Sequence, residues 1–304
     1  MSERVPPFVR ATLVAKGLTP PYVWSALRAL RARPRVEPAA PPLEPELEPT
    51  PQEWEYVPEG WARRAGGWNT EAIARVHREK WPSFLAAAEG PGPLGVNHEA
   101  PLGQPVPRDD LDAQQMVLGF GYALARAASG KTRVSILDWG GGPGHYAVLG
   151  RALLPGVELD YHSRDLPPLV TLGRELLPED SFHADDGCLA DSHDLVVASS
   201  SIQYAQDWRS TLARLAGSTA GYLYVTRVPV ALESASFVVL QRAYRYGYDT
   251  EYLGWVLNRG ELLEAAGAAG LELQREIILP AWLSAPGAPE DPVGHRGFLF
   301  APRG

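Results

Sequence analysis

The chain has 304 residues, 45% of them hydrophobic, and a formal net charge of −8 at pH 7. This length is enough for one large α/β domain with an additional helical or irregular part. The negative charge argues against general nucleic-acid binding, because a protein that displaces counterions from phosphates needs a basic surface.

The single cysteine, Cys188, excludes an internal disulfide and any metal site built from several cysteines, and no metal is predicted. No apolar run approaches the roughly 20 residues that span a bilayer. The N-terminus also lacks the long apolar core of a signal peptide. We therefore expect a cytoplasmic protein without a transmembrane segment.

The first segment, residues 1–36, is a basic arm. Its charged residues are Arg4, Arg10, Lys16, Arg28, Arg31, Arg33 and Arg35, against Glu3. Within it, Tyr22–Leu30 predicts a short helix after Pro20-Pro21, since proline is tolerated at helix starts. The arm either makes peripheral contact with an anionic membrane surface or a partner, or is an ordinary docking segment.

Residues 37–53 are a linker by composition, because prolines alternate with glutamates throughout this segment. A segment of this kind cannot bury apolar surface and is expected to be extended or disordered.

Residues 54–112 form an aromatic-rich cap with Trp54, Tyr56, Trp61, Trp68 and Trp81. Asn69-Thr70-Glu71 is expected to cap a helix over 71–88, which Pro82 should kink or restart. The aromatic residues either form the core of the cap or line a substrate pocket, and both can hold at once. They and the basic arm could also contribute to a homodimer, but the sequence does not fix the oligomeric state.

From a helix over 113–128 onward, strands and helices alternate as a parallel sheet with crossover helices requires. The predicted strands are Val134–Asp138, Glu158–Ser163, Ser181–Ala184, Leu195–Ser199, Tyr222–Arg227, Leu271–Leu279 and Arg296–Ala301. The predicted helices between them lie near 146–154, 168–177, 208–216 and 260–269. The prediction is a Rossmann-like α/β domain over 113–304 with a mostly parallel seven-stranded sheet, an antiparallel last strand, and an insertion at 228–259.

The first predicted strand ends in Asp138, and a glycine-rich turn follows with Gly140, Gly142 and Gly144 at alternate positions. A dinucleotide-binding turn would read Gly-x-Gly-x-x-Gly, but counting from Gly140 puts His145 at the third glycine position. The pattern of an acid followed by alternate glycines resembles the loop of class I S-adenosylmethionine (SAM)-dependent methyltransferases. That resemblance implies a backbone that approaches the cofactor closely and a carboxylate, Asp138, that anchors its ammonium.

The resemblance extends to acids after the next two strands. Asp165 in Asp165-Leu166-Pro167 resembles the acid that accepts the ribose hydroxyls, although Asp160 is a local alternative. Asp185-Asp186 stands where the family has an acid or amide on the adenine amine. Ser199 ends the fourth strand, and the resemblance implies that this end lies beside the methyl group.

A narrower resemblance is to a bacterial methyltransferase branch found with polysaccharide and glycan biosynthesis enzymes. The motifs that carry it are Leu18-Thr19-Pro20-Pro21, Trp139-Gly140-Gly141-Gly142-Pro143-Gly144, Tyr246-Gly247-Tyr248 and Trp255-Val256-Leu257-Asn258. The Pro/Glu linker and the tryptophan-rich segment depart from that branch.

Methyl transfer to an oxygen usually needs a base that removes the acceptor proton. The two catalytic candidates are His145, at the start of the helix after the glycines, and Tyr204, just past the fourth strand. His145 could equally bond locally at the helix start, and Tyr204 could simply close over the cofactor. Further candidates for a base are Asp207, Glu233 and His98.

These patterns predict an enzyme that transfers a methyl group from SAM, leaving S-adenosylhomocysteine, to a small-molecule or glycan hydroxyl. Aromatic residues of the 228–259 insertion are expected to roof the acceptor pocket. The alternatives are a nicotinamide-dependent oxidoreductase, which His145 disfavours, and a non-catalytic SAM-binding scaffold whose basic arm recruits partners.

Overall fold

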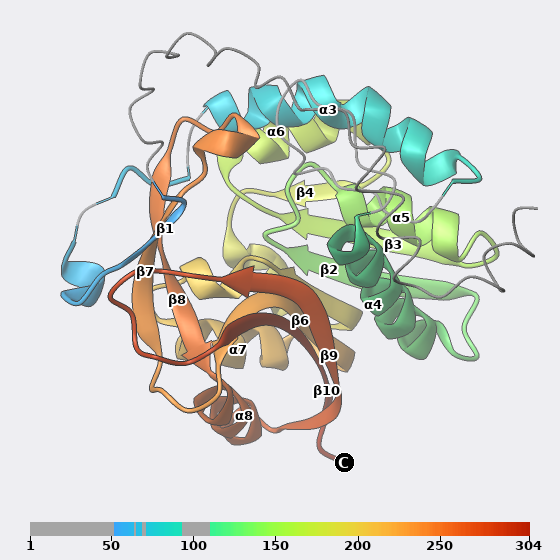
Figure 1. The fold of residues 1–304 in the computed structure, drawn as a ribbon. Coiled ribbons are helices and arrows are strands. Elements are labelled where there is room, and N and C mark those ends of the chain that lie inside the picture. Colours follow the sequence, from blue (N-terminus) through green and yellow to red (C-terminus); the bar gives the residue numbers. More distant parts are fainter. Residues whose placement is uncertain (1–51, 64, 69–70, 93–109) are drawn as a thin grey trace, which may run out of the picture. The chain divides into compact units, whose positions relative to one another are not determined.

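A curled ten-stranded sheet is the framework of the part of the chain that the computed structural model describes, residues 52–63, 65–68, 71–92 and 110–304 (Figure 1). These residues belong to the unit Pro51–Gly304. The predictions for the basic arm, nearly all of the linker, the Asn69-Thr70 cap and His98 lie outside the described residues.

Seven of the strands form the predicted α/β sheet. They are β2 (Arg133–Trp139), β3 (Glu158–Arg164), β4 (Ser181–His183), β5 (His193–Ser199), β6 (Thr219–Ala231), β9 (Leu271–Leu283) and β10 (Val293–Pro302). The first five pair in parallel in the order β4-β3-β2-β5-β6, and β10 runs antiparallel between β6 and β9. The predicted fold class, including the antiparallel last strand, is therefore confirmed.

Helices cover both faces of this sheet, which explains why its inner strands are apolar on both sides. The helices are α4 (Leu111–Ala128), α5 (His145–Leu153), α6 (Pro167–Leu176), α7 (Trp208–Gly217) and α8 (Arg259–Ala268). One core cluster joins the sheet to α4, α5 and α6, and a second joins it to α7 and α8. Each of these helices lies within two residues of its predicted range.

The cap helix α3 (Glu71–Glu89) contacts α5 and α6. It continues through Pro82 instead of restarting there, so the prediction of a restart was wrong. Trp81, directly before Pro82, and Phe84, two residues after it, are 5% and 1% exposed. Pro82 has no backbone N–H, which favours a break in the helix. The burial of these two aromatic side chains against the main core opposes that break.

The insertion after β6 is a hairpin of β7 (Phe237–Arg242) and β8 (Glu251–Asn258), with the short helix η4 (Tyr244–Tyr246) between them. β7 pairs with β1 (Trp54–Tyr56), and β8 pairs in parallel with the end of β6 at Val230 and Ala231. The hairpin therefore joins the cap segment to the main sheet. The sequence predicted an insertion here but not that it extends the sheet.

Candidate active site

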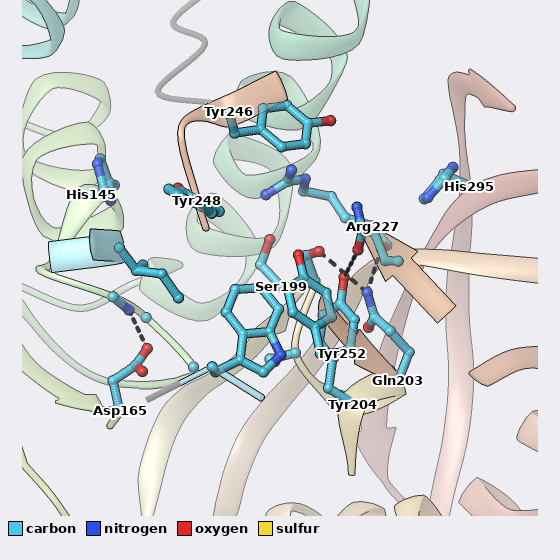
Figure 2. Close-up of a pocket in the computed structure, with 18 of the residues that line it drawn as sticks. His145, Asp165, Ser199, Gln203, Tyr204, Arg227, Tyr246, Tyr248, Tyr252 and His295 are labelled. Atoms are coloured by element: carbon cyan, nitrogen blue, oxygen red, sulfur yellow. Dashed lines mark hydrogen bonds between the residues drawn. The ribbon is translucent and has the colours of Figure 1, made fainter. Parts of the chain in front are cut away.

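A cavity of about 770 Å³ lies where β2, β3 and β5 reach their carboxyl ends. Parallel α/β sheets bind their ligands at this edge. The cap and the β7–β8 hairpin supply the other walls, and Figure 2 shows some of the side chains that line the cavity. Aromatic residues of both inserted segments contribute, namely Trp54, Trp68, Tyr246, Tyr248 and Tyr252.

The glycine turn begins directly after β2. Gly140, Gly142 and Gly144 have φ of 79°, 58° and 99°, a region that side chains strongly disfavour. Gly140 and Gly142 line the cavity, and a Cβ on Gly140 would lie 2.4 Å from Cβ of Ser201. Gly144 lies outside the cavity wall. It is the N-cap residue of α5 and packs closely against Leu177.

Asp165 fastens this turn to the end of β3. Its Oδ2 accepts the backbone N–H of Gly142 at 2.7 Å, and its Oδ1 accepts that of Leu166 at 2.6 Å. Burial raises the pKa of the Asp165 carboxyl, and these two N–H donors limit the rise. Both Asp165 and Leu166 line the cavity.

Asp138 lies beneath the turn and is fully buried, outside the cavity wall. The Tyr161 hydroxyl donates to its Oδ2 at 2.6 Å. Burial raises the pKa of Asp138 to about 7, although the bond from Tyr161 opposes that rise. Asp138 thus supports the turn from below, and its role as anchor of a cofactor ammonium stays a prediction.

Asp185 and Asp186 also lie outside the cavity wall. The Asp185 side chain accepts the Gly187 N–H at the start of η2 (Asp186–Ala190). Asp186 forms ion pairs with Arg164 at 2.6 Å and Arg214 at 2.7 Å. Burial alone would raise the pKa of Asp186, but these arginines lower it on balance. The adenine role of this pair therefore stays a prediction.

The carboxyl end of β5 faces the cavity through Ser199, Ser200 and Ser201. Ser199 Oγ lies 2.9 Å from the buried Tyr146 hydroxyl. Ser200 has φ of 50°, an unusual conformation for a residue with a side chain. The Ser201 hydroxyl donates to the Trp139 carbonyl at 2.8 Å and so ties β5 to the glycine turn.

His145 lines the cavity at the start of α5, but its ring is largely covered by the cap. It is 6% exposed and lies edge-on to Phe84 and Trp81, with ring centroids 4.8 Å and 5.2 Å away. The His77 ring lies 5.2 Å from it. The ring therefore has a packing role, and its part in catalysis stays a prediction.

Tyr204 lies on the opposite wall, at the end of η3 (Ile202–Tyr204). Its hydroxyl donates to Oε1 of Gln241 at 2.9 Å, and Gln241 donates in turn to Glu53 at 3.0 Å. Its ring packs edge-on against Trp68 and Tyr252, at 4.9 Å from each. Asp207, another candidate from the sequence, caps α7 by accepting the Ser210 N–H and lies outside the wall, as does Glu233.

Several polar residues of the wall were not identified from the sequence, among them Gln203, Arg227 and His295. His295 Nδ1 lies 3.2 Å from the Ala281 carbonyl, which can only accept, so Nδ1 carries a proton and Nε2 is the basic nitrogen of the neutral ring. The sequence offers no signal for Arg227 and His295, because their position depends on how β6 and β10 pair.

Among the described residues, no group of histidines, cysteines and acids is placed to hold a metal ion. In the same part of the chain, no helix combines the length and apolarity needed to cross a membrane.

No family model and no curated protein matches the chain. Solved structures do resemble it. A SAM-dependent methyltransferase from Clostridium acetobutylicum has 9% identity and a TM-score of 0.42, covering 62% of this chain and 92% of that one. SAM-bound CalS10, an amino pentose methyltransferase from Micromonospora echinaspora, has 16% identity and a TM-score of 0.40, covering 62% and 90%.

A third similar structure is 1,6-didemethyltoxoflavin-N1-methyltransferase from Burkholderia thailandensis, which holds 1,6-didemethyltoxoflavin and S-adenosylhomocysteine. It has 16% identity and a TM-score of 0.41, covering 80% of this chain and 94% of that one. The similarity to all three lies in the fold. In its sheet and glycine turn the chain resembles class I SAM-dependent methyltransferases, as the sequence predicts.

Proposed function

We propose that this protein is a SAM-dependent methyltransferase that acts on a hydroxyl oxygen of a small-molecule acceptor. The observation that carries the proposal is the glycine turn that Asp165 fastens to β3 at the edge of a large cavity. The turn supplies a backbone surface without side chains, and the cavity has room beyond it for a second molecule.

The residues of the turn suit the cofactor. Gly140 and Gly142 leave backbone open to the cavity at the end of β2, where a side chain would block approach. The Asp165 oxygens have remaining acceptor capacity, since a carboxylate offers about four lone-pair sites and two N–H groups use only part of them. This capacity supports a role for Asp165 in holding ribose hydroxyls.

The remaining walls suit an acceptor of moderate size with a flat apolar face. Trp68 stacks on Tyr252 with ring centroids 3.8 Å apart, and both line the cavity together with Tyr246 and Tyr248. Aromatic faces of this kind bind rings and the apolar faces of sugars. CalS10 and the toxoflavin enzyme are small-molecule methyltransferases by description, in keeping with an acceptor of this class.

When bound, the cofactor supplies an electrophilic methyl on a sulfonium. Transfer of that methyl to the acceptor oxygen would need a base that takes up the proton of the acceptor hydroxyl. The protein's part is to align the two reactants and exclude water. His145 and Tyr204 are the proposed proton-handling groups, and the basic Nε2 of His295 makes that residue a third candidate.

The first test is calorimetric titration of the purified protein with S-adenosylhomocysteine, with NADH as the comparison. Binding of S-adenosylhomocysteine in the micromolar range, with no NADH binding, is expected. The reverse result would favour the oxidoreductase. No binding of either ligand would overturn the proposal.

The second test separates an enzyme from a cofactor-binding scaffold. An acceptor screen that measures S-adenosylhomocysteine release is followed by His145→Gln, Tyr204→Phe and His295→Gln. Loss of turnover of about 10²–10⁴-fold with cofactor affinity retained identifies the base. A scaffold would show no turnover with any acceptor in the screen.

A further inference from the structure

Arg227 lies at a β-bulge in the middle of β6. β10 pairs Arg296 with Val228 and Phe298 with Val225, so Thr226 and Arg227 together oppose the single residue Gly297. On its other edge, β6 pairs with β5 as far as Thr226 and with β8 from Val230 onward. Arg227 therefore lies where β6 changes partner. Bulges at such places redirect a side chain.

The backbone at this point is in an unfavourable conformation. Arg227 has φ of 57°, and Ser200, at the end of neighbouring β5, has φ of 50°. These are the two residues other than glycine with positive φ in the described ranges. Strained residues of this kind persist where the surroundings fix them and are concentrated at functional sites.

Gln203 holds the two strained residues together. Its side-chain amide donates to Ser200 Oγ at 3.2 Å and to the Arg227 carbonyl at 3.3 Å. The Gln203 side chain is 3% exposed and itself lines the cavity. The Ser200 N–H also donates to the Thr226 carbonyl at 2.9 Å, so the ends of β5 and β6 are fixed to each other.

The result of this geometry is a cation inside the cavity. Figure 2 shows the Arg227 side chain extending toward the space between Tyr246 and Ser199. The positive charge of Arg227 also acts on Tyr146. Burial raises the pKa of the Tyr146 hydroxyl, and Arg227 opposes that rise.

We propose that Arg227 binds an anionic oxygen group of the methyl acceptor, a carboxylate or a phosphate. The inference rests on the proposed function and adds the acceptor's charge to it. The planar guanidinium fork matches both groups, and binding in a partly dry cavity strengthens the pairing. The aromatic walls then hold the rest of the acceptor, which makes an aromatic or cyclic acid the class that the site fits.

Gln203 is the positioning residue for this contact, because it acts on Arg227 through the backbone carbonyl and Ser200. If it serves only stability, its removal should weaken acid and neutral probes alike. If it aims the guanidinium, its removal should reduce the discrimination between them.

The test uses three aromatic probes of similar size, benzoate, phenyl phosphate and the neutral benzamide, titrated calorimetrically into the full chain saturated with S-adenosylhomocysteine. We expect at least one acid to bind ~10-fold or more tightly than benzamide. Which acid binds better distinguishes a carboxylate from a phosphate acceptor. Equal binding of acids and amide, or no acid binding at millimolar concentration, overturns the proposal.

Variants assign the preference to a residue. Arg227→Met should abolish the discrimination between acid and amide, Arg227→Lys should keep part of it, and Gln203→Leu should reduce it. Arg227→Gly also removes the guanidinium, and glycine adopts the positive φ without strain. This variant therefore shows whether a loss of discrimination in Arg227→Met comes from misfolding. Arg275→Met, on the exposed outer side of β9, is the matched control and should bind the probes as the wild type does. A preference unchanged in Arg227→Met and Arg227→Gly overturns the proposal.

S-Adenosylhomocysteine binding distinguishes a failure of this inference from a failure of the proposed function. S-Adenosylhomocysteine affinity should be unchanged in every Arg227 variant. If the cofactor product binds and the acids do not, the methyltransferase proposal stands and the charge of the acceptor is wrong. If S-adenosylhomocysteine itself fails to bind, both fall.

Discussion

Asp165 accepts the backbone N–H of Gly142 at 2.7 Å, although the two residues are 23 positions apart in the chain. The bond joins the end of β3 to the glycine turn that follows β2. A single carboxylate thus shapes the turn and borders the cavity at once. Its second oxygen accepts the N–H of Leu166, the residue directly before α6.

Substituting Asp165 by asparagine should therefore weaken cofactor binding. The amide cannot accept both backbone N–H groups, and hydrogen bonds to a charged group contribute about 1.5–3 kcal/mol. We expect S-adenosylhomocysteine affinity to fall by ~10- to 100-fold in calorimetric titration. Asp180→Asn is the control, because Asp180 accepts from Arg151 near the start of β4 and outside the cavity. Equal loss of affinity in the control would mean that general destabilisation is the cause.

Asp138 should make stability depend on pH. Its pKa in the folded state is about 7, above the ordinary aspartate value of 3.8, because burial favours the neutral acid. The folded state then holds a proton that the unfolded state releases, so stability falls as pH rises from about 4 to about 7. Asp138→Asn stays neutral and should avoid this loss, which is on the order of 3 kcal/mol. Urea unfolding of both proteins at pH 5 and pH 8 measures the difference, and parallel pH profiles would contradict the assignment.

Much of the fold was predictable because its signals are local. The run Val134–Leu137 is mostly apolar and contains two β-branched residues, and the glycines that follow it identify a strand, a turn and a helix without knowledge of any partner. The same holds for the N-cap Asp110 ahead of α4, whose carboxylate accepts the Ala113 N–H. The β7–β8 hairpin was missed because its strands contain the aromatic residues that a pocket roof would also contain.

The site was predictable only in part. Asp165 and Gly142 belong to a motif, so their proximity could be expected from the resemblance. Arg227 could not be found, since no motif in the sequence distinguishes it from the other arginines of the chain. Its place in the cavity depends on the bulge opposite Gly297, which is a property of strand pairing. His295 also depends on register, because it faces the cavity from a strand 150 positions after His145.

Gly144 should be needed for packing as well as for its backbone conformation. A Cβ there would lie 2.7 Å from Leu177 Cδ1 and 3.3 Å from Phe182 Cζ. Gly130 also has positive φ, 75°, but a Cβ there would meet nothing within 4 Å. Both alanine variants should lose about 1–2 kcal/mol from backbone strain, and Gly144→Ala a further ~1–3 kcal/mol from overpacking. Urea unfolding compares them, and equal losses would contradict the packing role.

The strain at Arg227 makes a prediction that does not require a ligand. In an ordinary strand, glycine is less stable than alanine by about 0.5–1 kcal/mol, because it loses more chain entropy on folding. At Arg227 the order should reverse, since alanine would keep the φ of 57° that costs about 1–2 kcal/mol and glycine would not. Arg227→Gly should therefore be more stable than Arg227→Ala by ~0.5–1 kcal/mol.

The matched control is Arg133 on β2, which is exposed and lies outside the residues with positive φ. There Arg133→Ala should be the more stable of the pair. Urea unfolding of the four variants gives the two differences. A reversal at position 227 alone means that the native chain retains an unfavourable backbone to keep the guanidinium in the cavity. The same order at both positions would mean that the bulge relaxes in solution and that Arg227 is not held in place.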